Sequence, residues 1–157
     1  MRQTLLLLFL ALILMPDTIN ALPFKEISTD NGLSNRRVQE SILDDNGYIW
    51  FATRSGIDRY NGEFFVHYTL SISAENEVTE HPRGILINDQ KEIYAFSEAN
   101  IYKFSYETDS FHQVNNVNLT QREAINAITF DPTGHLWIGT TEHLYRFNTN
   151  DSTLQSI

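Results

Sequence analysis

Histidine and aspartate side chains are the first candidates for chemistry, because they act in proteins as acids, bases and metal ligands. The five histidines form neither an H-x-x-x-H nor an H-E-x-x-H pattern, so we interpret them as surface or hydrogen-bonded residues. Asp44, Asp45 and Asp131 resemble catalytic carboxylates, but each lies just before a turn glycine, where aspartate ordinarily bonds the turn backbone. A phosphate-binding loop and a nucleophile elbow are both absent. The sequence therefore predicts no catalytic residue, no metal site and no cofactor.

Composition narrows the classes of function further. The 157-residue chain has 11 Lys and Arg against 20 Asp and Glu, a formal net charge of −9, and no cysteine. This charge disfavours nucleic acid and anionic membrane surfaces as partners. The lack of cysteine excludes thiolate metal ligands, cysteine nucleophiles and disulfides. A hydrophobic content of 41% in a chain of this length predicts one folded region with a real core.

The N-terminal segment has the organisation of an export signal. Arg2 precedes an unbroken apolar run over residues 5–15, Pro16 interrupts it, and Ala21 supplies a small residue for cleavage. The run is too short for a membrane span, which needs about 20 apolar residues. We expect residues 1–21 to be a signal peptide, no membrane span in the chain, and a periplasmic or secreted location after cleavage.

The rest of the sequence repeats itself every 43 or 44 residues. DDNGYIWFAT at 44–53 aligns with DPTGHLWIGT at 131–140, and IDRYN at 57–61 aligns with LYRFN at 144–148. A degenerate middle copy has Tyr94 in the place of the tryptophan and Lys91 in the place of the turn glycine. A repeat of this length is typical of helical repeats or propeller blades.

Local pattern decides between the two architectures. The first copy reads as four strands over 38–43, 48–53, 57–60 and 63–68, separated by turn residues. The second strand is apolar without alternation, as expected for a strand buried on both faces, and Trp50 and Trp137 are interpreted as packing residues. We predict an all-β fold over residues 22–157, a partial β-propeller of about three four-stranded antiparallel blades. The blades are expected at about 35–68, 80–114 and 122–157, with linkers at 70–79 and 115–120 and a short leading strand at 24–27.

Three segments of the first copy carry a family resemblance: GLSNRRV at 32–38, ILDDNGYIWFAT at 42–53 and GIDRYNG at 56–62. Together they resemble the two-component regulator propeller repeat, strongly in the first blade, well in the third and weakly in the second. The resemblance implies the periplasmic sensor region of a hybrid two-component sensor histidine kinase or a propeller-bearing diguanylate cyclase, often a carbohydrate sensor. It also implies that residues 24–29 pair with the final blade to close the ring.

Two functional hypotheses follow. Propellers close with four to eight blades, so three blades leave an open array. The first hypothesis is therefore an N-terminal fragment of an extracytoplasmic ligand-sensing receptor, lacking its membrane and output domains and with no enzyme activity of its own. The alternative is a secreted module that self-associates or binds a protein partner to close its ring.

A ligand site is predicted at one mouth of the ring. The entry to each first strand and the loop between the second and third strands lie at the same end of a blade. Arginine is a good donor to carboxylates and acidic sugars, although solvated loop charges are the alternative interpretation. The candidate residues for a small-molecule or carbohydrate ligand are Arg36, Arg37, Arg54, Ser55, Arg83, Arg122, Glu142 and His143.

Overall fold

The computed structural model describes residues 24–72, 78–119 and 123–157, and in these ranges the chain forms strands and one short 3-10 helix, η1 (Thr29–Asn31). The predicted signal peptide and Arg122 lie outside the described residues. No helix in the described ranges is long and apolar enough to cross a bilayer. Three four-stranded antiparallel sheets account for most of the fold, which confirms the predicted class of a β-propeller segment.

Each sheet is a meander in which consecutive strands pair, and each is called a blade below. Blade one consists of β1 (Val38–Leu43), β2 (Ile49–Thr53), β3 (Gly56–Tyr60) and β4 (Phe65–Tyr68). Blade two consists of β7 (Gly84–Ile87), β8 (Ile93–Phe96), β9 (Ile101–Ser105) and β10 (Ser110–Gln113). Blade three consists of β11 (Ile125–Phe130), β12 (His135–Thr140), β13 (Leu144–Asn148) and β14 (Thr153–Ser156).

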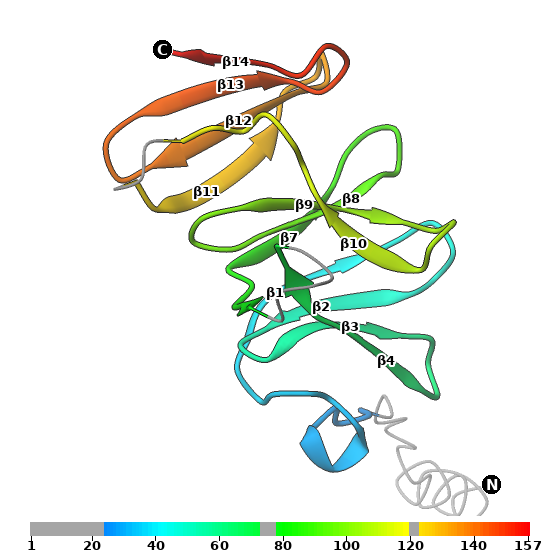
Figure 1. Ribbon diagram of the computed structural model, residues 1–157. Coiled ribbons are helices and arrows are strands. Elements are labelled where there is room, and N and C mark those ends of the chain that lie inside the picture. The colour runs from blue at the N-terminus through cyan, green and yellow to red at the C-terminus, as the bar shows by residue number, and fades with distance from the viewer. Residues whose placement is uncertain (1–23, 73–77, 120–122) are drawn as a thin grey trace, which may run out of the picture.

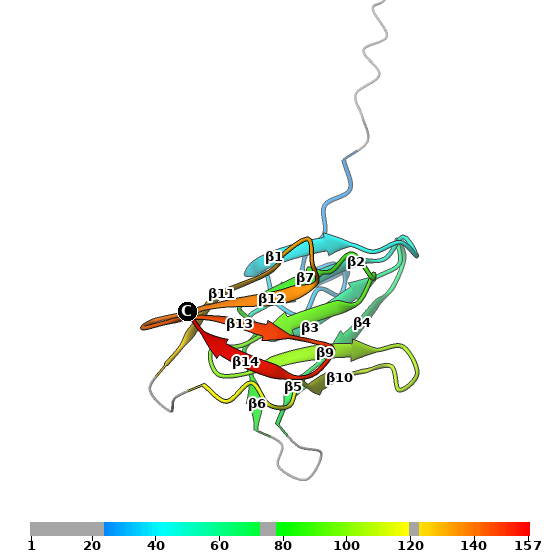
Figure 2. The same ribbon diagram turned by 90° about the horizontal axis from the view of Figure 1, so that it is seen from above.

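The blades stack face to face in chain order (Figure 1). Seen from above, the first strands of the blades lie on one side of the stack and the fourth strands on the other (Figure 2). The pairing of β1 with β2 shifts between Val38 and Glu40, and that of β11 with β12 shifts at the equivalent place, between Ile125 and Ala127. The sequence repeat is therefore reproduced in the backbone, down to a β-bulge.

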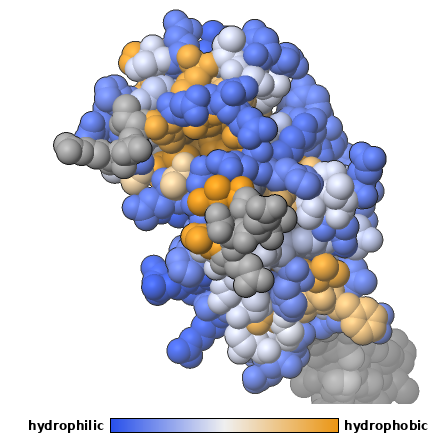
Figure 3. Space-filling model, viewed as in Figure 1, coloured by the Kyte–Doolittle hydropathy of each residue, from blue (hydrophilic) through white to orange (hydrophobic). Residues whose placement is uncertain are grey.

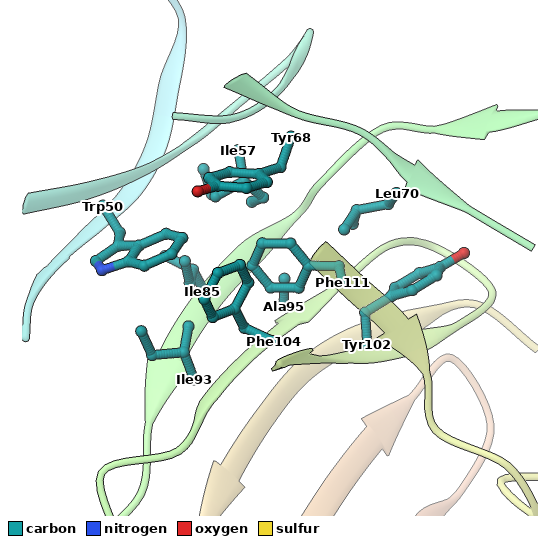
Figure 4. Packing of buried hydrophobic residues seen from close by; sticks show 11 residues of the cluster. Trp50, Ile57, Tyr68, Leu70, Ile85, Ile93, Ala95, Tyr102, Phe104 and Phe111 are labelled. Atoms are coloured by element: carbon teal, nitrogen blue, oxygen red, sulfur yellow. The ribbon is translucent and has the colours of Figure 1, made fainter. Parts of the chain in front are cut away.

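The core consists of two layers of side chains, one on each side of blade two. Because side chains alternate along a strand, each blade has an onward face, turned toward the following blade, and a backward face. Trp50 on the onward face of blade one packs against Phe104 of blade two, with ring centroids 4.8 Å apart. Figure 4 shows this layer, which also includes Ile57, Tyr68, Ile85 and Ile93.

The second layer lies between blades two and three. Tyr94 and Phe96 on the onward face of blade two meet Leu136 and Ile138 of blade three. All four residues of β8 are buried, because blades one and three cover both faces of blade two. The burial on both faces that the sequence predicts for the second strands of blades one and three is not found: Ile49 and Phe51 in β2 and Trp137 in β12 are only partly buried, because one face of each blade has no described blade against it. On the side of the molecule seen in Figure 3, hydrophobic side chains gather in the hollow between the two upper blades.

In blades one and three, the aspartate before the turn between the first and second strands bonds both the turn backbone and a tryptophan. Asp44 Oδ1 accepts from the backbone N–H groups of Asn46 and Tyr48, both at 2.9 Å, and Asp44 Oδ2 accepts from Trp50 Nε1 at 2.8 Å. Asp131 repeats the arrangement, with its Oδ2 2.9 Å from Trp137 Nε1. Hydrogen bonds from the Thr133 hydroxyl and the Trp137 indole hold the pKa of Asp131 well below its usual value. These aspartates are thus structural, as their turn positions indicate.

In blade two, the turn between the first and second strands, β7 and β8, is built from other residues. Lys91 adopts the left-handed conformation, with φ of 66°, that Gly47 and Gly134 adopt at the equivalent positions. Glu92 accepts hydrogen bonds from the Tyr94 hydroxyl and from Lys103 Nζ. Burial opposes ionisation of Glu92, but the hydrogen bonds from Lys103 and Asn88 outweigh it and lower the pKa of this carboxyl.

Two segments differ from the sequence expectation. Residues 24–27 do not form a strand and pair with no described strand; Phe24 is 95% exposed. Lys25 instead reaches the Tyr60 hydroxyl and the Gly62 carbonyl. The expected linker at 70–79 contains a two-stranded ladder of β5 (Leu70–Ser71) and β6 (Thr79–Glu80), in which Leu70 is fully buried.

Candidate ligand site between blades one and two

A cavity of about 370 Å³ lies between blades one and two. It is at the end of the blades where the β2–β3, β8–β9 and β12–β13 loops gather (Figure 1). This is the end to which the sequence assigned the candidate residues. The residues that line the cavity are Arg37, Gln39, Arg54, Thr79, Glu80, His81, Pro82, Arg83, Ser97 and Glu98.

Three arginines converge on this cavity from separate parts of the sequence. Arg83 is engaged, with its guanidinium 3.1 Å from Glu98 Oε2 and 3.1 Å from the Ile125 carbonyl. The guanidinium groups of Arg37 and Arg54 form no hydrogen bond or ion pair with any described residue. The Arg54 amide donates to the Arg37 carbonyl at 3.2 Å, so the two residues stand opposite each other at the ends of β1 and β2.

A hydrogen-bonded carboxylate lies at the inner side of the cavity. Glu80 accepts from the Ser97 hydroxyl, from Asn100 Nδ2 at 2.8 Å and from the Tyr102 hydroxyl at 2.7 Å. Burial, followed by the hydrogen bond to the Glu80 carboxylate, raises the pKa of Tyr102. The phenol therefore remains a donor at any physiological pH, and Glu80 is held in place.

Blade three contains the same group of side chains 43 residues later. Glu123 accepts from the Thr140 hydroxyl at 2.7 Å and from the Tyr145 hydroxyl at 2.9 Å, and His143 Nδ1 lies 3.1 Å from it. Burial, followed by the hydrogen bond to the Glu123 carboxylate, raises the pKa of Tyr145. In both blades these hydrogen bonds are structural. They connect a glutamate that precedes the first strand to one residue just after, or at the end of, the second strand and to one tyrosine on the third strand.

Blade one arranges the corresponding acid differently. Arg36 is at the position of Glu80 and Glu123, and the buried acid is Asp58 on β3, at the position of Tyr102. Asp58 accepts from the Ser34 hydroxyl at 2.8 Å and lies 2.7 Å from His67 Nδ1. Sequence analysis did not single out Asp58, Glu80 or Glu123. The 43-residue spacing of Glu80 and Glu123, each with a hydroxyl residue 17 positions later, is the signal that would have found two of them.

The predicted site residues separate into three groups. Arg37, Arg54 and Arg83 line one cavity. Arg36 is exposed beside it, and Ser55 accepts a hydrogen bond from Asn35 Nδ2 at 3.0 Å without lining it. The remaining described candidates, Glu142 and His143, lie on blade three and do not line this cavity.

Blade three also contains a close group of possible metal ligands. One ligand atom from each of Glu123, Glu142 and His143 lies within 4.8 Å of the others. Glu123 is already hydrogen-bonded to the Thr140 and Tyr145 hydroxyls. We therefore interpret this group as part of the blade's internal hydrogen bonding and assign no metal to it.

A comparison with protein-family models found a match in this chain. Residues 119–142, which end in the β12–β13 loop, match the model described as two-component regulator propeller. This segment of blade three is thus similar to a two-component regulator propeller repeat. The match confirms the family that the sequence resembles, on a segment of blade three. A comparison with curated protein sequences found no match.

Solved structures of similar fold include extracellular domains of two component and one component systems and an enzyme. The extracellular domain of a hybrid two component system, BT3049 from B. thetaiotaomicron, is 21% identical with a TM-score of 0.67, over 83% of this chain and 19% of that one. The extracellular domain of a one component system, BT4673 from the same organism, is 17% identical with a TM-score of 0.69, over 85% and 18% of the two chains. Virginiamycin B lyase from Staphylococcus aureus is 15% identical with a TM-score of 0.60, over 76% and 40%.

These similarities establish the propeller fold of the segment. The chain spans about a fifth of the length of the two sensor domains. Extracellular domains of signalling systems and a lyase share this fold, so the function has to be argued from the site and not from the architecture.

Proposed function

We propose that this chain is an extracytoplasmic ligand-sensing propeller segment of a bacterial signal-transduction receptor. The observation that supports this most is the cavity between blades one and two, where Arg37, Arg54 and Arg83 converge from strand entries and loops. The propeller repeat and the similarity to extracellular domains of two component systems favour a sensor over an enzyme. The signal-like segment at 1–21 favours an extracytoplasmic location.

The cavity is well placed for sensing because two rigid units contribute to it. Arg37 and Arg54 belong to blade one, whereas Arg83, Ser97 and Glu98 belong to blade two. A ligand that contacts both sides adds a link between the blades and stabilises one relative arrangement of them. In a receptor, that change in stability is the signal passed to the output region.

Thermal unfolding with a panel of small metabolites tests the proposal. A ligand that uses the cavity raises the Tm of the unmodified chain, and Arg54→Gln removes the increase. Arg36→Gln is the matched control, because Arg36 is a neighbouring exposed arginine that does not line the cavity. If every shift survives Arg37→Gln and Arg54→Gln, the cavity is not the sensing site. Cell fractionation checks location: the chain is expected outside the cytoplasm, without residues 1–21.

The alternative proposal, a secreted module that assembles with a second copy or a protein partner, is favoured by the onward face of blade three. Leu144 on this face is 42% exposed, whereas the equivalent Ile57 of blade one is fully buried. Sedimentation velocity distinguishes the proposals. A defined oligomer that dissociates on Trp137→Asp supports the module, and a monomer at every concentration contradicts it.

A further inference from the structure

We propose that the cavity between blades one and two binds a small hydroxylated monocarboxylate, such as a sugar acid, with Arg37 and Arg54 contacting its carboxylate. This inference rests on the proposed sensing function and specifies the class of ligand.

The first argument is the unbalanced charge at the ends of β1 and β2. Arg37 and Arg54 stand opposite each other across the ladder, and like charges directly opposite on neighbouring strands destabilise a sheet. Neither guanidinium has a partner among the described residues, although the chain as a whole carries a net charge of −9. An anion between them turns this repulsion into two charge-assisted contacts, and the planar guanidinium fits a carboxylate with two parallel hydrogen bonds.

The second argument is the net charge of the residues that line the cavity, which limits the charge of a ligand. Among the described lining residues, three arginines face two carboxylates, Glu80 and Glu98, which leaves one net positive charge. Glu98 neutralises Arg83. The Glu80 carboxylate accepts hydrogen bonds from Ser97, Asn100 and Tyr102, and its charge disfavours additional negative charge nearby. A monoanion therefore suits this lining better than a dianion such as hydrogen phosphate.

The third argument is the character of the rest of the lining. The described residues that line the cavity include no Phe, Tyr or Trp, so they recognise a ligand by charge and hydrogen bonds and not by stacking. Gln39, Thr79 and His81 supply polar groups suited to hydroxyls. A volume of about 370 Å³ lies within the range of small-molecule sites. Together these features favour a polyhydroxylated acid with a single ring.

Isothermal titration calorimetry at neutral pH and low salt tests the ligand class with three probes: glucuronate, glucose and inorganic phosphate. Glucuronate and glucose differ at the carboxylate. We expect glucuronate to bind at least about tenfold more tightly than glucose or phosphate, because a charge-assisted contact is lost with glucose. Arg37→Gln and Arg54→Gln are each expected to weaken glucuronate binding about tenfold or more, and Arg36→Gln to leave it unchanged.

The outcomes separate the ligand class from the sensing function. Equal affinity for glucose and glucuronate, preference for phosphate, or no binding of glucuronate overturns the monocarboxylate inference. If a neutral ligand from the metabolite panel binds and Arg54→Gln abolishes its effect, the sensing proposal survives and the inference fails. If no ligand acts through the cavity, both fail. Arg54→Lys, which retains the charge but not the planar fork, keeps the test decisive if Arg54→Gln does not fold, and is expected to give an intermediate affinity.

Discussion

The onward faces of blades one and three have the same pattern of residues but different environments. On blade one, Trp50 is fully buried, and the Arg59 guanidinium lies 5.4 Å from its ring centroid and 5.9 Å from that of Phe104 in blade two. Asp109 completes the site, 3.0 Å from Arg59. On blade three, Trp137 is half-buried, and Arg146 bonds to His135 of its own blade at 3.0 Å.

This difference shows which properties of a blade are local. The strand pairing, the bulge and the aspartate–tryptophan hydrogen bond are the same in both blades, so they follow from the repeat itself. Burial of the tryptophan and enclosure of the arginine require a following blade, since Phe104 and Asp109 come from blade two. Energetically, the two tryptophans are therefore not equivalent.

The largest expected effect comes from truncating the two tryptophans. Trp50→Ala empties a space in a closed core and is expected to lower the free energy of unfolding by about 3–5 kcal/mol. Trp137→Ala is expected to cost less than half of that, because the side chain is already partly hydrated. Urea unfolding of both variants measures the difference, and equal losses would contradict the comparison.

A smaller difference is expected for the two aspartates that hold these tryptophans. Asp44→Ala leaves the fully buried Trp50 indole N–H without its acceptor, at a cost of about 2–3 kcal/mol. Asp131→Ala is expected to cost less, since water reaches the half-buried Trp137. Chemical unfolding at neutral pH tests this prediction. A greater loss for Asp131→Ala would show that the turn bonds dominate over the indole bond.

The third prediction concerns how the stability of blade three depends on pH through Asp131. Hydrogen bonds lower the pKa of Asp131 in the folded state, so its carboxylate stabilises the fold above the pKa of the unfolded chain, about 4. This contribution is lost progressively as the pH falls below that value. Unfolding measurements from pH 6 to pH 2.5, values spanning about that pKa, are expected to show a shallower acid loss in Asp131→Asn than in the unmodified chain. Identical profiles would mean that the carboxylate charge contributes nothing.

The smallest effect concerns the degenerate turn of blade two. Lys91 occupies the left-handed conformation that costs a non-glycine residue roughly 1 kcal/mol, and its exposed ion pair with Asp45 recovers little of it. Lys91→Gly is expected to stabilise the chain by about 0.5 kcal/mol after the added flexibility of the unfolded state is subtracted. A rise of about 1–2 °C in Tm is the expected result; a lower Tm would show that the Lys91–Asp45 pair outweighs the strain.

Properties that depend on neighbouring residues can be predicted from the sequence alone. Alternation along strands, turn glycines and the repeated aspartate and tryptophan specified three antiparallel blades and indicated which end would gather the loops. These features are local, because strand direction and turn geometry are set within a few residues. The same reasoning placed Arg37, Arg54 and Arg83 at one end of the blades before their distances were known.

Which of those side chains share a cavity depends on how the blades pack against each other. This packing united Arg37 and Arg54 with Arg83 of the next blade, left Arg36 exposed beside them, and gave the Glu80 carboxylate its three donors. It also buried Trp50 but not Trp137, and left residues 24–27 without the strand that the sequence favours. Burial and strand pairing depend on surfaces contributed by distant parts of the chain. The local sequence of one repeat does not specify which other blade packs against each of its faces.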